Sequence, residues 1–299
     1  MAGETWRRDL PQFFNVWDMA WDSLDGPAAV HGLDGRVMSA DPDQGQMTLM
    51  VRIPAGWKFT ESAEDGALEV FVLEGDVTGN GKRVGAGGFL AVPLGCGPLE
   101  LSSEGGAYAY VWYDPQFVTG YYYDSQPFIT KVWQEAWILT EMPEVRHGIM
   151  HKSLRWPDPC EGLQHGGPGG MLRFIMLTPG FPEARQETHH DCWEGIIFLS
   201  GDFMMPERGI HGPGSYLGNP AELRHGGLMT QAGTLMILHC DAPMGAEFTE
   251  IPNGRQIVES YLDTTSWLSP PGHTPWEDAP QFNLYPSTEP AYAVPVEAS

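Results

Sequence analysis

Arg185 to Phe203 reads RQETHHDCWEGIIFLSGDF, a polar start with two histidines followed by an apolar run that ends in Ser-Gly-Asp. The run from Glu194 is short, rich in isoleucine and phenylalanine and closed by a turn, which predicts a β-strand. Strand alternation, extended backwards, places Thr188, His190 and Glu194 on one face. An imidazole and a carboxylate on one face are the beginning of a divalent-metal site, and further ligands must come from elsewhere in the chain.

The second half of the chain repeats sequence blocks of the first half. Four blocks recur in the same order at offsets from 116 to 127 residues: VWDMAW and VWQEAW, MTLMVRIPAG and MLRFIMLTPG, LEVFVLEGD and EGIIFLSGD, AYAYVWYDP and TLMILHCDAP. Such a repeat, built from short apolar runs separated by glycine and proline, predicts a duplicated β-domain of the sandwich or barrel class. Helical periodicity is weak, and its best candidate is Thr130 to Met142.

The repeat divides the chain into three predicted parts. They are an N-terminal β-domain at residues 1–125, a C-terminal β-domain at 126–262 and a Pro-rich extended tail at 263–299. A chain of 299 residues is long enough for two such domains.

Composition excludes some functions. The formal net charge of −23 repels phosphate backbones and anionic membrane surfaces, so neither nucleic acid nor a membrane is expected as a partner. Four cysteines without a CxxC pair fit a reduced interior, and no signal peptide or membrane span is apparent, so we expect a cytoplasmic protein. The expected partner is a small-molecule substrate, and a homodimer is compatible with the tail.

The opening stretch resembles the first motif of the cupin superfamily, G(x)5HxH(x)3-4E(x)6G. His190, three residues, Glu194, six residues and Gly201 match its second half. The resemblance implies an all-β fold of two tandem cupin-type antiparallel jelly-roll barrels, a bicupin, with His190 and Glu194 as metal ligands.

The second cupin motif, G(x)5PxG(x)2H(x)3N, is matched by Gly214, Pro220 and His225 at the right spacing. Glu222 stands where the motif has glycine, and Met229 stands where it has asparagine. The resemblance makes His225 the third expected ligand.

The chain departs from the family at the first ligand. Thr188 stands at that position, and the additional histidine is the adjacent His189. Neighbouring residues of a regular strand point to opposite faces, so His189 binds the same ion only if the backbone bulges there. His239, in the last strand of the domain, is either a fourth ligand or a hydrogen-bond partner of one.

The first half serves as an internal comparison. At the positions of the ligand candidates it carries Glu64, Leu68, Pro98 and Trp112. Most of these cannot ligate a metal, so the second half alone is expected to bind one in the family manner.

The resemblance implies a divalent metal ion, with Fe(II) as first choice and Mn(II), Ni(II) or Zn(II) as alternatives. The leading hypothesis is a dioxygenase that acts on a small dicarbonyl, enol or phenolic substrate. Glu194 is the candidate catalytic residue, and Ile196, Phe198 and Met236 are expected to form an apolar pocket wall.

Two alternatives stay open. The same metal could serve a non-redox isomerase, lyase or decarboxylase, in which Glu194 or a nearby group moves the proton. The chain could also be a small-molecule-binding or sensor module without catalysis, because a fold does not determine a function.

Overall fold

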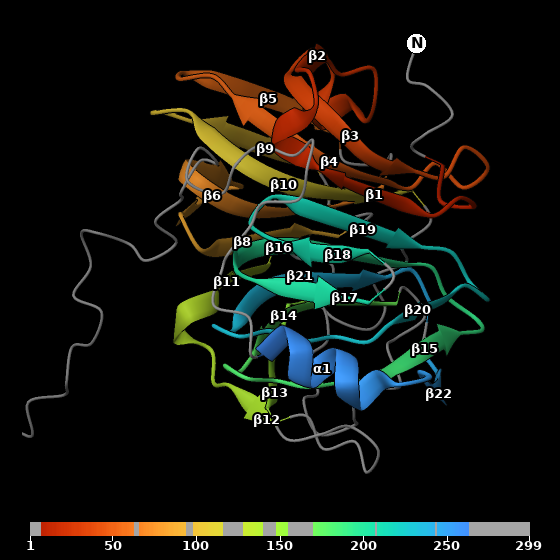
Figure 1. Cartoon of the computed structure of the whole chain (residues 1–299). Coiled ribbons are helices and arrows are strands. Elements are labelled where there is room, and N and C mark those ends of the chain that lie inside the picture. The colour runs from red at the N-terminus through yellow and green to blue at the C-terminus, as the bar shows by residue number, and fades with distance from the viewer. Residues whose placement is uncertain are drawn as a thin grey trace, which may run out of the picture.

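The computed structural model describes residues 7–62, 66–93, 98–115, 128–139, 148–154, 170–206, 208–242 and 244–262. Antiparallel strands form almost all of the regular structure, in two barrels stacked on each other (Figure 1). The expected all-β fold with two jelly-roll barrels is confirmed. Among the described residues the one α-helix is α1, Gly254–Leu262.

A sheet of ten strands builds the first barrel, and β6 is its longest strand. Its order is β11-β8-β6-β10-β4-β3-β2, with β5, β7 and β9 joined to the side. The elements of the first half are β1 Gln12–Asn15, η2 Val16–Asp18, β2 Asp22–Ser23, η3 Ala28–Val30, β3 Asp34–Ala40, β4 Met47–Ile53, β5 Trp57–Ser62, β6 Ala67–Gly79, β7 Lys82–Gly85, β8 Gly88–Val92, β9 Pro98–Ser103 and β10 Ala107–Asp114.

The second barrel has a sheet of seven strands in the order β1-β19-β16-β21-β14-β13-β12, faced by a sheet of three strands in the order β20-β15-β22. A short hairpin, β17 with β18, completes it. The elements of the second half are β11 Phe128–Lys131, η4 Val132–Gln134, β12 Ile138–Leu139, β13 Ile149–Ser153, β14 Met171–Leu177, β15 Arg185–His189, β16 Glu194–Gly201, β17 Phe203–Met205, β18 Gly209–His211, β19 Ser215–Asn219, β20 Arg224–Gly226, β21 Thr234–Cys240, β22 Ala246–Glu250 and α1.

Each half lends its first strand to the other barrel. β1 pairs antiparallel with β19 of the second half, with Gln12 opposite Gly218. β11 pairs antiparallel with β8 of the first half, with Phe128 opposite Ala91. The barrels are therefore interlocked by exchanged strands. The boundary near residue 125 and the extended tail stay predictions, because residues 116–127 and 263–299 lie outside the described parts.

The repeated VWxxAW motif connects each exchanged strand to its own barrel. Its first three residues form the 3-10 helices η2 and η4. The candidate helix over Thr130 to Met142 is wrong, because its described residues lie in β11, η4, an irregular segment at 135–137 and β12. The Arg36 guanidinium lies 3.9 Å from the ring centroid of Trp21, and Lys152 Nζ lies 4.4 Å from that of Trp137. Cation–π contacts of this kind stabilise a buried junction by about 1 to 2 kcal/mol. In both copies of the repeat, the last tryptophan therefore packs against a buried cation.

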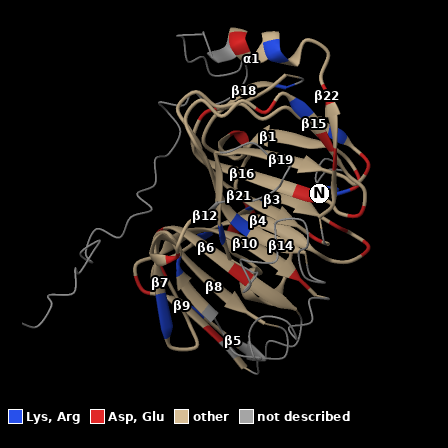
Figure 2. Ribbon diagram, turned by 90° about the horizontal axis from the view of Figure 1, so that it is seen from below, with Lys and Arg blue, Asp and Glu red and all other residues tan. Residues whose placement is uncertain are grey.

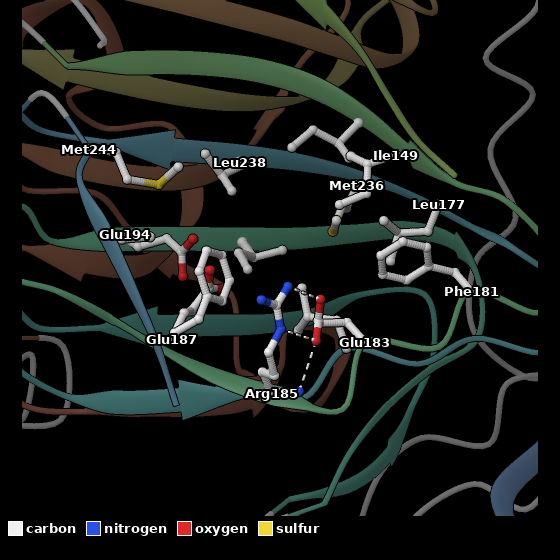
Figure 3. A pocket seen from close by; sticks show the side chains of 15 residues that line it. Ile149, Leu177, Phe181, Glu183, Arg185, Glu187, Glu194, Met236, Leu238 and Met244 are labelled. Atoms are coloured by element: carbon white, nitrogen blue, oxygen red, sulfur yellow. Dashed lines mark hydrogen bonds and ion pairs between the residues drawn. The ribbon is translucent and has the colours of Figure 1, made fainter. Parts of the chain in front are cut away.

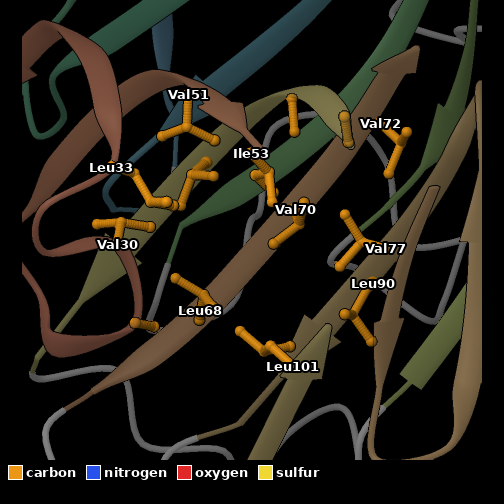
Figure 4. Packing of buried hydrophobic residues seen from close by; sticks show 14 of the residues in the cluster. Val30, Leu33, Val51, Ile53, Leu68, Val70, Val72, Val77, Leu90 and Leu101 are labelled. Carbon is orange, nitrogen blue, oxygen red and sulfur yellow. The ribbon is translucent and has the colours of Figure 1, made fainter. Parts of the chain in front are cut away.

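Aliphatic side chains fill the interior of the first barrel (Figure 4). Leu68, the repeat counterpart of Glu194, is buried in this cluster, and Pro98 lies exposed at the start of β9. Trp112 is buried between the barrels. Glu64 lies outside the described residues. None of the described counterparts could bind a metal ion, which agrees with the expectation that the ligands lie in the second half.

The second barrel differs because polar residues enter its interior. Glu194, His189 and His225 are buried beside a cluster of methionine, phenylalanine and aliphatic side chains. Elsewhere the charged residues lie mainly at strand ends and in loops, while the central parts of most strands carry none (Figure 2). The buried charges of the second barrel therefore mark its interior as the candidate site.

Candidate metal centre

Two short strands and the start of a third bring the candidate ligands together. Glu187 and His189 lie on β15, and Glu187 is the register partner of His225 on β20. Glu194 is the first residue of β16, in the facing sheet. One nitrogen or oxygen atom from each of these four residues lies within 4.8 Å of those from the others. Such a group of two imidazoles and two carboxylates can surround one divalent ion.

The interatomic distances define the centre. His225 Nε2 lies 3.0 Å from Glu194 Oε2 and 3.6 Å from Glu187 Oε1. His189 Nε2 lies 3.5 Å from Glu187 Oε2. His189, Glu194 and His225 are almost completely buried, whereas the Glu187 side chain is 17% exposed. Glu187 is thus the most exposed of the four ligand candidates.

Neighbouring groups fix the orientation of two of these side chains, His225 and Glu194. The Nδ1–H of His225 donates to the Leu223 carbonyl at 2.8 Å, which directs Nε2 toward the centre. Asn219 Nδ2 donates to Glu194 Oε2 at 3.0 Å. His189 Nε2 is buried and makes no hydrogen bond. A buried nitrogen that faces carboxylates without a hydrogen bond is the arrangement that an ion would satisfy, so the residues fit a metal.

The charges of the cluster shift its pKa values strongly. Burial alone would raise the pKa of Glu194, but the charge of His189 and the hydrogen bond from His225 outweigh burial and lower it to about 2. Burial likewise opposes the charged form of His189, but the charge of Glu194 and its other polar contacts raise its pKa to about 11. The pKa of His225 is raised despite burial, chiefly by Glu194. Without an ion, the imidazoles therefore serve as counter-ions of the carboxylates.

His190, expected as a ligand, lies outside the centre. Its side chain is 46% exposed and its ring nitrogens contact Glu222 at 3.0 Å and Glu247 at 3.2 Å. β15 ends at His189, and the four residues before Glu194 form a bend rather than a strand. Alternation therefore cannot be counted backwards from Glu194, and this is why His189 points inward and His190 outward.

His239 is also displaced from the centre. β21 turns Met236, Leu238 and Cys240 toward the interior of the second barrel, so His239 points to the opposite face. There its ring packs against Trp193 and Trp112, with centroids 5.5 and 6.4 Å apart. It contacts the junction between the barrels, on the face of β21 opposite to the four clustered ligand candidates.

Glu187 is the candidate ligand that the sequence interpretation missed. The motif allows three or four residues between its second histidine and its glutamate, and four residues separate His189 from Glu194. With that spacing the first ligand position moves from Thr188 to Glu187. Thr188 stays on the strand without joining the cluster. The four-residue spacing of the motif could therefore have pointed to Glu187. With that spacing, His189 reaches the centre without a bulge in the strand.

A largely apolar cavity opens beside the centre (Figure 3). Ile196 and Met236 line it, whereas Phe198 packs deeper against Phe203 with ring centroids 4.4 Å apart. Glu187 and Glu194 reach the cavity from the centre. The full lining is Ile149, Ile175, Leu177, Phe181, Glu183, Arg185, Glu187, Glu194, Ile196, Leu228, Met236, Leu238, Met244, Ala246 and Phe248.

One ion pair interrupts the apolar wall. Arg185 Nε and Nη2 donate to Glu183 at 3.0 and 2.9 Å, and the guanidinium lies 4.5 Å from the Phe248 ring centroid. Arg185, Glu187 and His189 alternate on one strand, and the Arg185–Glu183 pair lies beside Glu187 at the cavity wall (Figure 3). The cavity therefore has the carboxylates of the candidate centre at one end, one ion pair beside them and mainly apolar walls.

Comparison with known proteins agrees with this architecture. Residues 12–112 match the family model of the ChrR cupin-like domain. A salicylate 1,2-dioxygenase from Pseudoaminobacter salicylatoxidans superimposes with a TM-score of 0.55 over 81% of this chain and 85% of its own, at 13% identity. The chain therefore has a fold of two cupin-type jelly-roll barrels, a bicupin fold, and its first half matches a cupin family model. The matched family model covers the first barrel of the bicupin, which is the one without the ligand cluster.

Two further solved structures resemble the bicupin over most of their length. A candidate dioxygenase from Nostoc punctiforme has a TM-score of 0.63 and 17% identity, with 82% of this chain and 87% of that chain covered. A candidate glyoxylate-induced protein from Pseudomonas aeruginosa has a TM-score of 0.60 and 15% identity, with 83% and 95% covered. No curated protein matches the sequence. At these identities the likeness concerns the fold. No helix among the described residues is long and apolar enough to cross a membrane.

Proposed function

We propose that this bicupin is a metal-dependent enzyme that acts on a small oxygenated organic molecule, with dioxygenation as its reaction type. The observation that supports it is the convergence of two imidazoles and two carboxylates at one end of an apolar cavity. Burying these charged groups costs free energy if they only pack the interior, whereas they could bind a metal ion and a substrate there.

The ligand set favours a divalent ion, and we propose Fe(II). Two carboxylates, Glu187 and Glu194, balance the charge of such an ion, while His189 and His225 supply neutral nitrogens. Mixed imidazole and carboxylate ligands suit iron and manganese better than they suit softer ions. When bound, the ion supplies Lewis acidity toward substrate oxygens and, as iron, reactivity with O2.

The residues of the chain have separate parts in this proposal. Glu194, held by Asn219, keeps a fixed position at the centre. Glu187 borders the cavity and can accept a proton from a substrate hydroxyl or enol. Ile196 and Met236 form walls that hold an apolar substrate body and exclude water.

A second candidate is a non-redox isomerase, lyase or decarboxylase reaction. Glu187 favours it, because the motif of the family has an imidazole at that position and a carboxylate at the cavity wall is a suitable general base. The two candidates differ in their need for O2.

The experiment is an activity screen. The protein is loaded with Fe(II) under anaerobic conditions and is then mixed with β-diketones, enols and phenols, both with and without O2. We expect substrate-dependent O2 uptake that is lost in Glu194→Ala and kept in His190→Ala. Turnover without O2 selects the second candidate. Saturable binding of these compounds with no turnover under either condition contradicts both and leaves a binding module.

A further inference from the structure

A group of sulfur atoms lies on the side of His189 that faces away from the carboxylates. Cys192 Sγ is 3.7 Å from His189 Nδ1, and Cys240 Sγ is 3.8 Å from Met244 Sδ. The ligand atoms of His189, Cys192 and Cys240 all lie within 4.8 Å of one another. All four residues are buried, and Met244, the most exposed of them, has an exposed fraction of 7%. We call this group the sulfur cluster.

The local structure explains why these residues meet. Cys192 lies in the four-residue bend between β15 and β16, and Cys240 ends β21 as the register partner of Glu194. Met244 follows shortly after β21 and lines the cavity. The bend that turns His189 inward therefore also brings its Nδ1 onto the thiol of Cys192.

The spacing and the atom types suit a soft cation. With metal–sulfur bonds of about 2.3 Å and metal–nitrogen bonds of about 2.0 Å, the neighbouring ligand atoms of a tetrahedron lie roughly 3.5 to 3.8 Å apart. The distances of 3.7 and 3.8 Å in the sulfur cluster agree with two such edges. Thiolate, thioether and imidazole ligands select thiophilic ions such as Zn(II) and Cu(I).

We propose that His189 Nδ1, Cys192, Cys240 and Met244 form a second ion site, for a thiophilic d10 cation. An ion can reach it from the cavity, because Met244 lies at the cavity wall. The site shares only His189 with the carboxylate centre, which uses Nε2 of the same ring. It therefore does not rest on the proposed enzymatic function.

The two sites can be separated by substitution. The double variant Glu194→Gln, His225→Asn removes ligands of the carboxylate centre alone. Cys192→Ser and Cys240→Ser remove ligands of the sulfur cluster alone. Met244→Leu keeps the size of the side chain and removes only the thioether, which is a better ligand for Cu(I) than for Zn(II).

The test uses the reduced, metal-free, full-length protein. It is titrated with Co(II) as a spectroscopic substitute for Zn(II), and separately with Zn(II) and Cu(I) against a competing chromophoric chelator. We expect a thiolate-to-cobalt absorption band with one equivalent of ion, retained in the double variant and in a variant with Cys96 and Cys160 changed to serine. The double variant Cys192→Ser, Cys240→Ser should lose the band, and each single variant should weaken it and bind the ion at least roughly 100-fold more weakly.

Met244→Leu tests the fourth ligand. Weaker binding of Cu(I) in this variant supports Met244 as a ligand, and unchanged binding of both Cu(I) and Zn(II) overturns its place in the site. Absence of a thiolate band in the folded, reduced wild type overturns the proposal, as does a band of unchanged intensity and affinity in Cys240→Ser. A Cys192–Cys240 disulfide, seen as a loss of two hydrogens by mass, with no ion uptake after reduction, overturns it as well.

Discussion

Replacing Glu194 by glutamine removes one charge from a buried site and keeps the size of the side chain. In the metal-free protein we expect this change to lower the free energy of unfolding by about 3 kcal/mol near pH 5.5. The pKa of Glu194 is lowered from 4.5 to about 2 by its imidazole neighbours. A shift of that size, at about 1.4 kcal/mol per pKa unit, corresponds to about 3 kcal/mol.

The expected effect depends on pH in both directions. The pKa of Glu194 is lowered on folding, so its contribution is present above pH 4.5 and is lost as the pH falls toward 2. The pKa of His189 is raised to about 11, so its contribution is present below pH 6.5 and is lost as the pH rises from there to 11. Both shifts describe one interaction and are not added. The difference between wild type and variant should be greatest between pH 4.5 and 6.5.

The assay is urea unfolding of chelator-treated protein between pH 3 and 9. Glu250→Gln, on the exposed side of β22, is the control and should change stability little at any pH. A difference between wild type and Glu194→Gln that is equal at pH 3, 5.5 and 9 would refute the reasoning, because it would show that the buried charges do not stabilise one another.

Three further changes test other parts of the structure. Gly201→Ala places a Cβ 1.9 Å from a backbone oxygen at φ +85°, so urea unfolding should show a loss of at least about 3 kcal/mol, whereas Gly209→Ala, at φ +84° in open space, should cost about 1 kcal/mol. Lys152→Met removes the cation from its tryptophans and its 2.7 Å bond to a carbonyl, which should lower the unfolding free energy by about 2 kcal/mol, compared with no change for the exposed Lys58→Met. His239→Asn should retain a full equivalent of bound metal by elemental analysis, because that side chain faces the barrel junction.

Much of the architecture could be predicted from the sequence. The internal repeat gave two β-domains, and the second cupin motif identified His225 by its spacing from Gly214. The spacing to Gly201 likewise pointed to Glu194. The structure places Glu194 and His225 in one cluster, because these signals depend on residues within one strand or one turn, where backbone geometry relates spacing directly to direction.

The choice between His189 and His190 could not be made in the same way. The four residues between His189 and Glu194 form a bend, and a bend has no fixed alternation. Both spacings, three and four, satisfy the motif, and only the path of the bend decides between them. Glu187 was missed for the same reason, since its place depends on which histidine points inward.

The strand exchange was beyond the reach of local patterns. β1 and β19 are separated by about 200 residues, and the sequence of neither segment indicates which strand it pairs with. The VWxxAW repeat was visible, but its weak periodicity did not reveal that each copy packs around a cation from its own barrel. Such pairings follow from the packing of the whole chain.

Metal content of two neighbouring alanine variants tests the central claim most directly. Protein purified without chelators, loaded with Fe(II) and freed of excess ion, is analysed for bound metal as wild type, His189→Ala and His190→Ala. We predict that His190→Ala keeps its metal, because its side chain is 46% exposed and contacts surface carboxylates, and that His189→Ala loses most of it. Retention by His189→Ala together with loss by His190→Ala would contradict the centre formed by Glu187, His189, Glu194 and His225.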